Sequence, residues 1–366
     1  MENVLKQEKG IPIINYTMDE LYRESLNLLK ELIAVESFSK QEDKSAEILS
    51  DFFSRKRISH QRKSNNLWAF NRNFNPKLPT ILLNAHHDTI RPAFGWSINP
   101  FFPLIENGKI YGLGSNNAGA ALVSLITTFL YFNEYENLKY NLVFAATSEV
   151  EISGNNGMKQ IFSKLGEIDF AIIGEPTKMQ LIIAEKALLV LECVAHTKPG
   201  FSIQENEGNA IEIAMNDIAW FRNFKHSNLL SPLKIVLTNI ETTNTGDNVS
   251  KSCKFTVEVR TGETFDIDEL LELIGKNIFS EIKVLSSGLN SDIIDKSHPL
   301  ISAGTALGRN ILSSRGTRDK ALIDVPSLIL GPGDPARSYT CDEFVYLYEI
   351  NEGISMYIAM LSKLLQ

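Results

Sequence analysis

The stretch from 79 to 132 constrains the fold more than any other part of the chain. It opens with Thr80–Ala85, a short apolar run typical of a buried strand, and this run ends on His86-His87-Asp88. A glycine-rich turn over 112–119 follows, and Asn117 is placed to cap an apolar helix that continues to about residue 131. Such a strand, turn and helix bring a histidine, a carboxylate and a helix-start side chain together. The stretch therefore predicts an arrangement suited to a metal ion.

Strands and helices alternate through the rest of the first half and at the C-terminal end. The pairs Thr17/Glu20 and Ser39/Glu42 have the spacing of capping boxes, so each predicts the start of a helix. The other expected elements follow from apolar runs and amphipathic periodicity: strands over 67–70, 140–146, 169–173 and 327–330, and helices over 157–165, 299–307 and 343–365. This alternation predicts an α/β fold with a mainly parallel sheet flanked by helices.

The pattern changes between residues 185 and 289, where longer strands replace the regular alternation. The expected strands cover 187–195, 233–240, 252–260 and 281–285, and the expected helices cover 209–221 and 266–278. This segment predicts a separate α+β domain inserted in the first. The first domain then consists of residues 1–184 and 290–366.

Composition excludes several classes of protein. The 366 residues are 43% hydrophobic and 22% charged, which is ordinary for a globular protein, and the net charge of -8 argues against nucleic-acid binding. Three cysteines are too few and too scattered for a disulfide framework, and they suit a reducing compartment. We find no leader pattern and no apolar run of membrane length, so we expect a cytoplasmic protein.

Five motifs in order resemble one known family. The chain is similar to the zinc-dependent metallopeptidases and deacylases that include acetylornithine deacetylase, succinyl-diaminopimelate desuccinylase, aminoacylase and carboxypeptidase G. It is most similar to the acetylornithine deacetylase-like members, and the similarity extends from about Met18 to the C-terminus. The motifs that carry it are His86-x-Asp88, Gly112-x-Gly114-Ser115-Asn116-Asn117, Ser148-Glu149-Val150-Glu151, Gly174-Glu175-Pro176-Thr177 and Gly331-Pro332-Gly333-Asp334-Pro335-Ala336-Arg337-Ser338-Tyr339.

The resemblance implies a zinc-peptidase-like catalytic domain, a lid that also forms a homodimer, and a two-metal site that hydrolyses linear amides. His86 and Glu175 match ligands of one metal, and Asp88 matches the carboxylate that orients the His86 ring. Glu151 matches a ligand of the second metal. The resemblance places three more residues: Asn117 at the bridge between the metals, Tyr339 at the second metal's histidine, and Val150 at the general base.

Several of these positions carry the wrong chemistry. The amide of Asn117 brings no charge to hold two dications together, and the isopropyl group of Val150 cannot accept a proton. Tyr339 could ligate only as a phenolate, from a reference pKa of about 10. In the lid, Phe201 stands where relatives carry an oxyanion-stabilising histidine. Glu149 could replace the base only if the loop shifted register.

Other residues have a structural interpretation beside the functional one. His87 should point to the opposite side of the strand from His86, so we interpret it as structural. Arg260 matches a lid arginine that resembles a carboxylate clamp, but it could equally pair with a nearby acid at the end of a strand. The family's lid asparagine could correspond to Asp247, or to Asn248 with a one-residue shift.

The sequence leaves two functions open. One is a deacylase of the acetylornithine deacetylase type, acting on N-acyl amino acids such as N-acetylornithine or N-acetylcitrulline in arginine biosynthesis. The other is a non-catalytic binding protein, or a structural partner of an active paralogue, on the same fold. The substitutions predict that activity is weak or absent and that at most one zinc or cobalt ion is well held. We expect a homodimer that does not bind nucleic acid or membranes.

Overall fold

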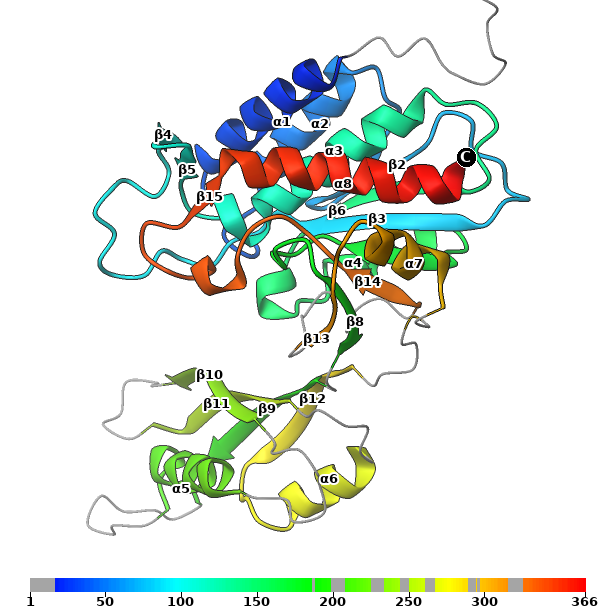
Figure 1. Ribbon diagram of the computed structural model, residues 1–366. Coiled ribbons are helices and arrows are strands. Elements are labelled where there is room, and N and C mark those ends of the chain that lie inside the picture. Colours follow the sequence, from blue (N-terminus) through cyan, green and yellow to red (C-terminus); the bar gives the residue numbers. More distant parts are fainter. Residues whose placement is uncertain are drawn as a thin grey trace, which may run out of the picture. The chain divides into compact units, whose positions relative to one another are not determined.

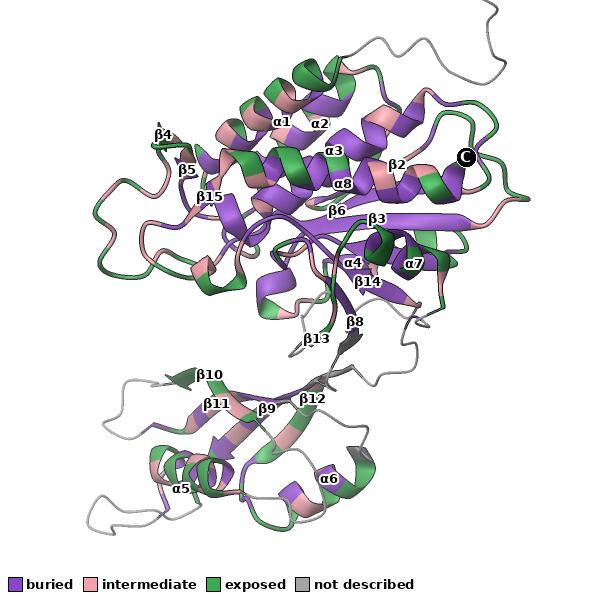
Figure 2. Cartoon of the chain, viewed as in Figure 1, coloured by how far each residue is buried: buried purple, intermediate pink, exposed green. Residues whose placement is uncertain are grey.

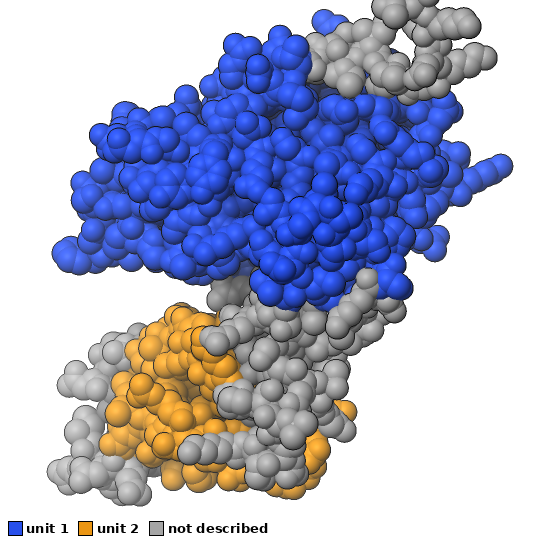
Figure 3. All heavy atoms as spheres, in the orientation of Figure 1, with its two compact units in different colours: residues 1–184, 292–312, 322–366 blue, residues 185–291, 313–321 orange. Residues whose placement is uncertain are grey.

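The computed structural model describes residues 17–185, 188–198, 208–224, 234–243, 250–260, 267–288, 294, 297–314 and 325–366. The chain divides into two compact units, shown in different colours in Figure 3. Unit 1 comprises residues 1–184, 292–312 and 322–366, and unit 2 comprises residues 185–291 and 313–321. The predicted boundaries, with residues 1–184 and 290–366 in the first domain and residues 185–289 in the inserted one, stay a prediction.

The main sheet is the framework of unit 1 (Figure 1). Its central strands β6, β3, β7 and β14 run parallel to one another, whereas β2 pairs antiparallel with β6 and β8 pairs antiparallel with β14. The predicted α/β fold with a mainly parallel sheet is therefore confirmed. In spatial order the strands are β1 (Gln61–Lys63), β2 (Asn66–Phe70), β6 (Asn141–Thr147), β3 (Thr80–His86), β7 (Phe170–Ile173), β14 (Ser327–Ile329), β8 (Leu181–Glu185) and β13 (Ile311–Ser314).

Helices cover both faces of this sheet. Alternate residues of β3 face two different cores: Ile81 and Leu83 pack in the larger core, and Leu82 packs in the smaller one. Figure 2 shows the resulting pattern of buried strands and helices with exposed outer faces. The larger core is formed with α1 (Met18–Ile33), α2 (Asp43–Arg55), α3 (Ala120–Asn133), α7 (Pro299–Ala306) and α8 (Leu347–Leu365), and the smaller with α4 (Met158–Ile161).

A second, three-stranded sheet in unit 1 was not anticipated. Its order is β15 (Phe344–Tyr346), β5 (Lys109–Tyr111) and β4 (Leu104–Glu106), all antiparallel. Because residues 344–346 pair with β5, the last helix begins at Leu347 and not at Glu343 as predicted. This pairing places Glu343 beside the glycine-rich turn, where its carbonyl accepts the Gly112 N–H at 3.0 Å.

Unit 2 has its own sheet and its own core. The strand order is β10 (Lys234–Thr243), β11 (Ser252–Arg260), β9 (Leu188–His196) and β12 (Glu281–Gly288), and all pairs are antiparallel. The amphipathic helices α5 (Ala210–Asn223) and α6 (Ile267–Gly275) supply apolar side chains to the same core as β9 and β11.

Two of the three predicted helix caps are wrong, and tertiary contacts explain why. The Thr17/Glu20 capping box forms as predicted. Ser39 instead donates its hydroxyl to Asp88 at 2.7 Å, and α2 begins four residues later. Asn117 lies before the cap of α3, which begins at Ala120. The Ser39 and Asn117 side chains form hydrogen bonds with residues distant in sequence, and these bonds replace the local helix caps that the sequence predicts.

Among the helices that the structure describes, none is long and apolar enough to span a membrane.

Candidate functional site

His86 stands at the C-terminal end of β3 and is almost completely buried. Its Nδ1 lies 3.0 Å from the Asp88 carbonyl oxygen and 3.4 Å from Asp88 Oδ1. Because a carbonyl can only accept a hydrogen bond, Nδ1 carries a proton. On the other side of the ring, Nε2 lies 3.6 Å from Oε1 of Glu175, which follows β7. Two of the predicted ligands are thus neighbours, with the His86 tautomer set by Asp88.

Asp88 ties the end of β3 to the segment that carries Glu151. Its carboxylate accepts the backbone N–H groups of Val150 and Glu151 at 3.1 and 3.0 Å, besides the Ser39 hydroxyl. Burial opposes ionisation, but the hydrogen bond and charge of His86, together with the other donors, hold the pKa of this carboxyl below its usual value. Asp88 is thus built to remain an anion that orients His86.

The Glu151 carboxylate lies between two hydrogen-bond donors. Asn117 Nδ2 donates to Oε1 at 2.8 Å, and the Tyr339 hydroxyl donates to Oε2 at 2.8 Å. Glu151 and Asn117 are buried, whereas the Tyr339 side chain is half exposed. The structure therefore brings together the three positions that the resemblance assigns to the second metal, but as a hydrogen-bonded cluster. We call these three residues the Asn117–Glu151–Tyr339 cluster.

The general-base position offers no proton acceptor near this cluster. Val150 is buried, and its hydrogen bonds are made by the backbone alone: its N–H donates to Asp88 and its carbonyl accepts the Ser153 N–H at 2.9 Å. Glu149 has left-handed backbone geometry, with φ of 55°. Its carboxylate accepts the Asn156 side-chain amide at 2.9 Å and the Asn156 N–H at 3.4 Å. Glu149 is therefore engaged within its own loop.

Glu343 supports the turn that carries Asn117, and sequence analysis missed it. Its Oε1 accepts the N–H groups of Asn116 and Asn117, both at 2.8 Å, and its Oε2 accepts that of Gly114 at 3.2 Å. Burial raises the pKa of this carboxyl to about 7; these three N–H groups oppose the rise, and the charge of Glu151 adds to it. The peptide bond after Asn117 is cis. An acid just before an apolar strand was the only sequence signal for Glu343.

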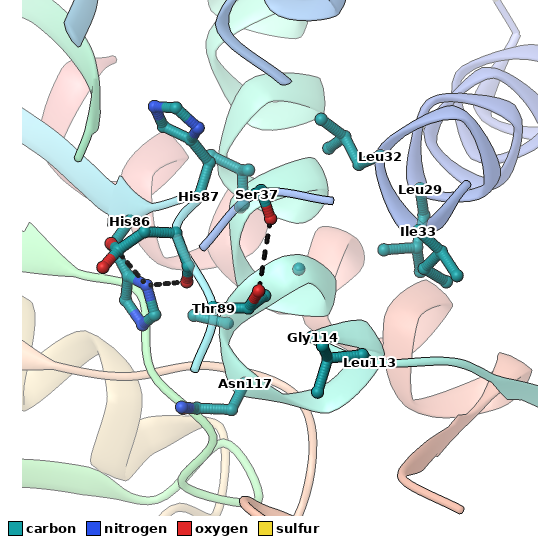
Figure 4. A pocket seen from close by; sticks show the side chains of 14 residues that line it. Leu29, Leu32, Ile33, Ser37, His86, His87, Thr89, Leu113, Gly114 and Asn117 are labelled. Atoms are coloured by element: carbon teal, nitrogen blue, oxygen red, sulfur yellow. Dashed lines mark hydrogen bonds and ion pairs between the residues drawn. The ribbon is translucent and has the colours of Figure 1, made fainter. Parts of the chain in front are cut away.

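His87 has the structural role that the sequence predicted. Its Nδ1 lies 2.9 Å from the Ser45 hydroxyl, and its Nε2 lies 2.8 Å from the Asn65 carbonyl oxygen. Burial lowers the pKa of His87 to about 4, although the nearby charge of Asp88 opposes this. Figure 4 shows the His86 and His87 rings directed to different sides of the chain.

The space beside these histidines is small. A cavity of about 20 Å³ is lined by His86, Ser37 and Thr89 together with apolar side chains of α1 and α3 (Figure 4). This volume has room for about one water molecule. The cavity lies between the end of β3 and α1, so it is packing space and not a substrate pocket.

The lid residues that the resemblance singled out cannot be placed in this site. Phe201, Asp247 and Asn248 lie outside the described residues, as does the side chain of Arg260.

The residues present do not fit a pair of metal ions. Among the described residues, no group of three or more His, Cys, Asp and Glu side chains forms a metal site. The Asn117 amide faces Glu151 with its nitrogen, which cannot ligate, and the Tyr339 hydroxyl is used as a donor. His86 Nε2 and Glu175 Oε1, 3.6 Å apart, are close enough together to share one ion.

The comparison with protein families decides the ancestry. The sequence pattern of the peptidase family M20/M25/M40 matches residues 82–363. The chain belongs to this family. The resemblance inferred from the five motifs is confirmed, and the M20 family includes metallopeptidases and amide hydrolases such as the relatives below.

Curated relatives of this M20-family chain differ in coverage. It is 31% identical to a succinyl-diaminopimelate desuccinylase of Buchnera aphidicola subsp. Cinara cedri over 172 residues, which are 43% of this chain and 44% of that protein. It therefore spans less than half the length of that relative. It is 25% identical to a peptidase M20 domain-containing protein of Schizosaccharomyces pombe over 354 residues, or 92% of this chain and 83% of that one.

Solved structures share the fold of this M20-family chain. The Saccharomyces cerevisiae di-peptidase Dug1p matches with a TM-score of 0.69 at 14% identity, covering 94% of this chain and 96% of that one. A dinuclear metal binding peptidase of the M20 family from Bacillus subtilis matches with a TM-score of 0.64 at 16% identity, covering 94% and 98%. At such identities the likeness concerns the fold alone.

Proposed function

We propose that this chain is an acetylornithine deacetylase-like member of the M20 family whose hydrolysis of N-acyl amino acids is weak or absent. The observation that carries the proposal is the Asn117–Glu151–Tyr339 cluster, in which each Glu151 oxygen accepts one 2.8 Å hydrogen bond. An ion held jointly by Glu151, Asn117 and Tyr339 would replace both bonds, and Tyr339 would have to lose a proton from a group with a reference pKa of about 10. The cluster thus stabilises a state without the second metal.

The missing proton acceptor supports the same proposal. A general base must lie within hydrogen-bond reach of the water it activates. Val150 has no group for this role, and the Glu149 carboxylate is held by Asn156. Without a second ion and without a base, two independent contributions to amide hydrolysis are lost, each typically worth orders of magnitude in rate.

A second candidate role is non-catalytic: binding of a small amide or peptide ligand, or a structural partnership with an active paralogue. The supporting observation is that the scaffold around the site is intact although its chemistry is altered. Asp88 still accepts three donors and Glu343 still holds the turn through three N–H groups. An intact scaffold with altered chemistry is what a role other than hydrolysis on the same fold would leave.

The test is metal content combined with an activity assay. The purified protein is loaded with excess zinc, dialysed and analysed for metal, and hydrolysis of N-acetylornithine and N-acetylcitrulline is measured with zinc and with cobalt. We expect no more than one retained ion per chain and little or no hydrolysis. Two retained ions with rapid hydrolysis would contradict the proposal. If hydrolysis is absent, calorimetric binding of the same amides distinguishes a binding protein from a structural partner.

The cytoplasmic location and the homodimer through unit 2 stay predictions. The exposed apolar residues Leu237 and Ile240 on β10, an edge strand of the unit 2 sheet, support the dimer. Light scattering of the intact chain checks it, with Ile240→Lys expected to shift the mass toward the monomer.

A further inference from the structure

A large polar groove lies in unit 1 at the edge of the main sheet. Its volume is about 850 Å³, which is within the range of small-molecule sites. It is bordered by the end of α2 and the following loop, by the end of β2, and by the end of α3. Nothing in the proposed function uses it.

The groove is remote from the Asn117–Glu151–Tyr339 cluster. The turn of Asn117 leads into the N-terminal end of α3, and Asn133, the last residue of α3, lines the groove. A helix of 14 residues is about 20 Å long at 1.5 Å per residue. The two places are therefore at opposite ends of the same helix, and they can be tested separately.

Positive charge is concentrated in the groove, although the protein as a whole carries a net charge of -8. The charged side chains that line it are Arg55, Lys56, Arg57 and Arg72, with Glu134 as the one acid among them. A locally positive hollow on an acidic protein focuses the electrostatic field and attracts anions.

Existing ion pairs account for only part of this charge. Arg55 pairs with Glu31 at 3.2 Å, Arg72 pairs with Glu134 at 3.0 Å, and Lys56 pairs with Glu24. Arg55 and Lys56 also lie favourably at the C-terminal end of α2. Arg57, beyond that end, makes no ion pair within the part of the chain described here. Exposed ion pairs such as that of Arg72 contribute little to stability, so a multivalent ligand can displace them.

We propose that this groove binds a small anion that carries at least two charges on phosphate or carboxylate oxygens. Guanidinium groups bind such oxygens through paired, charge-assisted hydrogen bonds. Arg57, which makes no ion pair among the described residues, supplies one guanidinium, and Arg72 supplies a second after release from Glu134.

The experiment is calorimetric titration of the intact chain at low ionic strength, with inorganic pyrophosphate in one arm and citrate in the other. We expect saturable binding with Kd on the order of 0.1–1 mM in at least one arm, and weaker binding as added salt screens the charges. Tighter binding of pyrophosphate identifies phosphate as the preferred group, and tighter binding of citrate identifies carboxylate. No saturable binding in either arm overturns the proposal.

Matched variants locate the site. Arg57→Gln removes the uncommitted charge and is expected to weaken binding about tenfold. Arg62→Gln removes an exposed arginine of β1 that does not line the groove, and it should leave Kd unchanged. Thermal unfolding of each variant verifies that the fold is intact. Equal losses in Arg57→Gln and Arg62→Gln would mean non-specific attraction and would overturn the proposal.

Discussion

At the scale of single residues, the contact between Asn117 and Glu151 determines whether the site can accommodate a second carboxylate at position 117. Asn117→Asp would place a second carboxylate 2.8 Å from Glu151, where both residues are buried. We expect a loss of about 2–4 kcal/mol in the free energy of unfolding in a chelator, because two buried like charges repel. Zinc should recover much of that loss. Thermal unfolding with chelator and with zinc measures both effects.

Asn117→Ala is the control for this substitution. It removes the same hydrogen bond without adding charge, so zinc should stabilise it no more than zinc stabilises the unsubstituted protein. Neither single substitution should restore hydrolysis, since Val150 and Tyr339 remain. Restoring activity would need Asn117→Asp, Val150→Glu and Tyr339→His together with Phe201→His. Full activity from Asn117→Asp alone would contradict our account of the other three positions.

His87 makes stability depend on pH. Its pKa is about 4 in the folded protein and 6.5 for a free side chain, so between these values only the unfolded chain takes up the proton. The free energy of unfolding should therefore fall as pH drops from about 6.5 to about 4, by about 3 kcal/mol in total. Denaturant unfolding across this range should show a smaller decline for His87→Gln. His196→Gln, at a half-exposed histidine, should leave the decline unchanged.

At the scale of elements, the short sheet of β4, β5 and β15 positions the turn before α3. Glu343 at the start of β15 accepts three backbone N–H groups of that turn. In Glu343→Gln the amide NH2 would face N–H donors, so we expect a loss of about 1–3 kcal/mol in stability. The denaturation midpoint measures it. Glu106→Gln, at an exposed position of β4, should leave the denaturation midpoint unchanged. If Glu343→Gln and Glu106→Gln shift the midpoint equally, the three hydrogen bonds of Glu343 contribute nothing to stability.

At the scale of the whole molecule, two units with separate cores should unfold in more than one step. Asp217 of α5 is a probe for unit 2, because its carboxylate accepts the N–H groups of Phe279 and Ser280 and the Ser280 hydroxyl at 2.6–3.0 Å. Asp217→Ala should lower one calorimetric transition by several degrees, since it leaves buried donors unpaired, and should leave the other unchanged. A single transition shifted as a whole would mean that the units unfold cooperatively.

The amino-acid sequence by itself determined the fold class, the family and the order of the five family motifs along the chain. Apolar runs such as Thr80–Ala85 and the capping box at Thr17 depend on local periodicity and local hydrogen bonds, and both elements formed as predicted. Local patterns were sufficient there because the tertiary contacts agree with them: β3 pairs with β6 and β7 through the same residues that the apolar run predicts as a strand.

Tertiary structure alone decided how the site side chains are used. Ser39 and Asn117 have the local pattern of helix caps, yet they bond to Asp88 and Glu151 across 49 and 34 residues of sequence. Glu343 has no local signal of its role, because its partners lie 226–229 residues earlier. Buried carboxylates must find donors wherever the fold brings them, and sequence spacing carries no information about which donors those are.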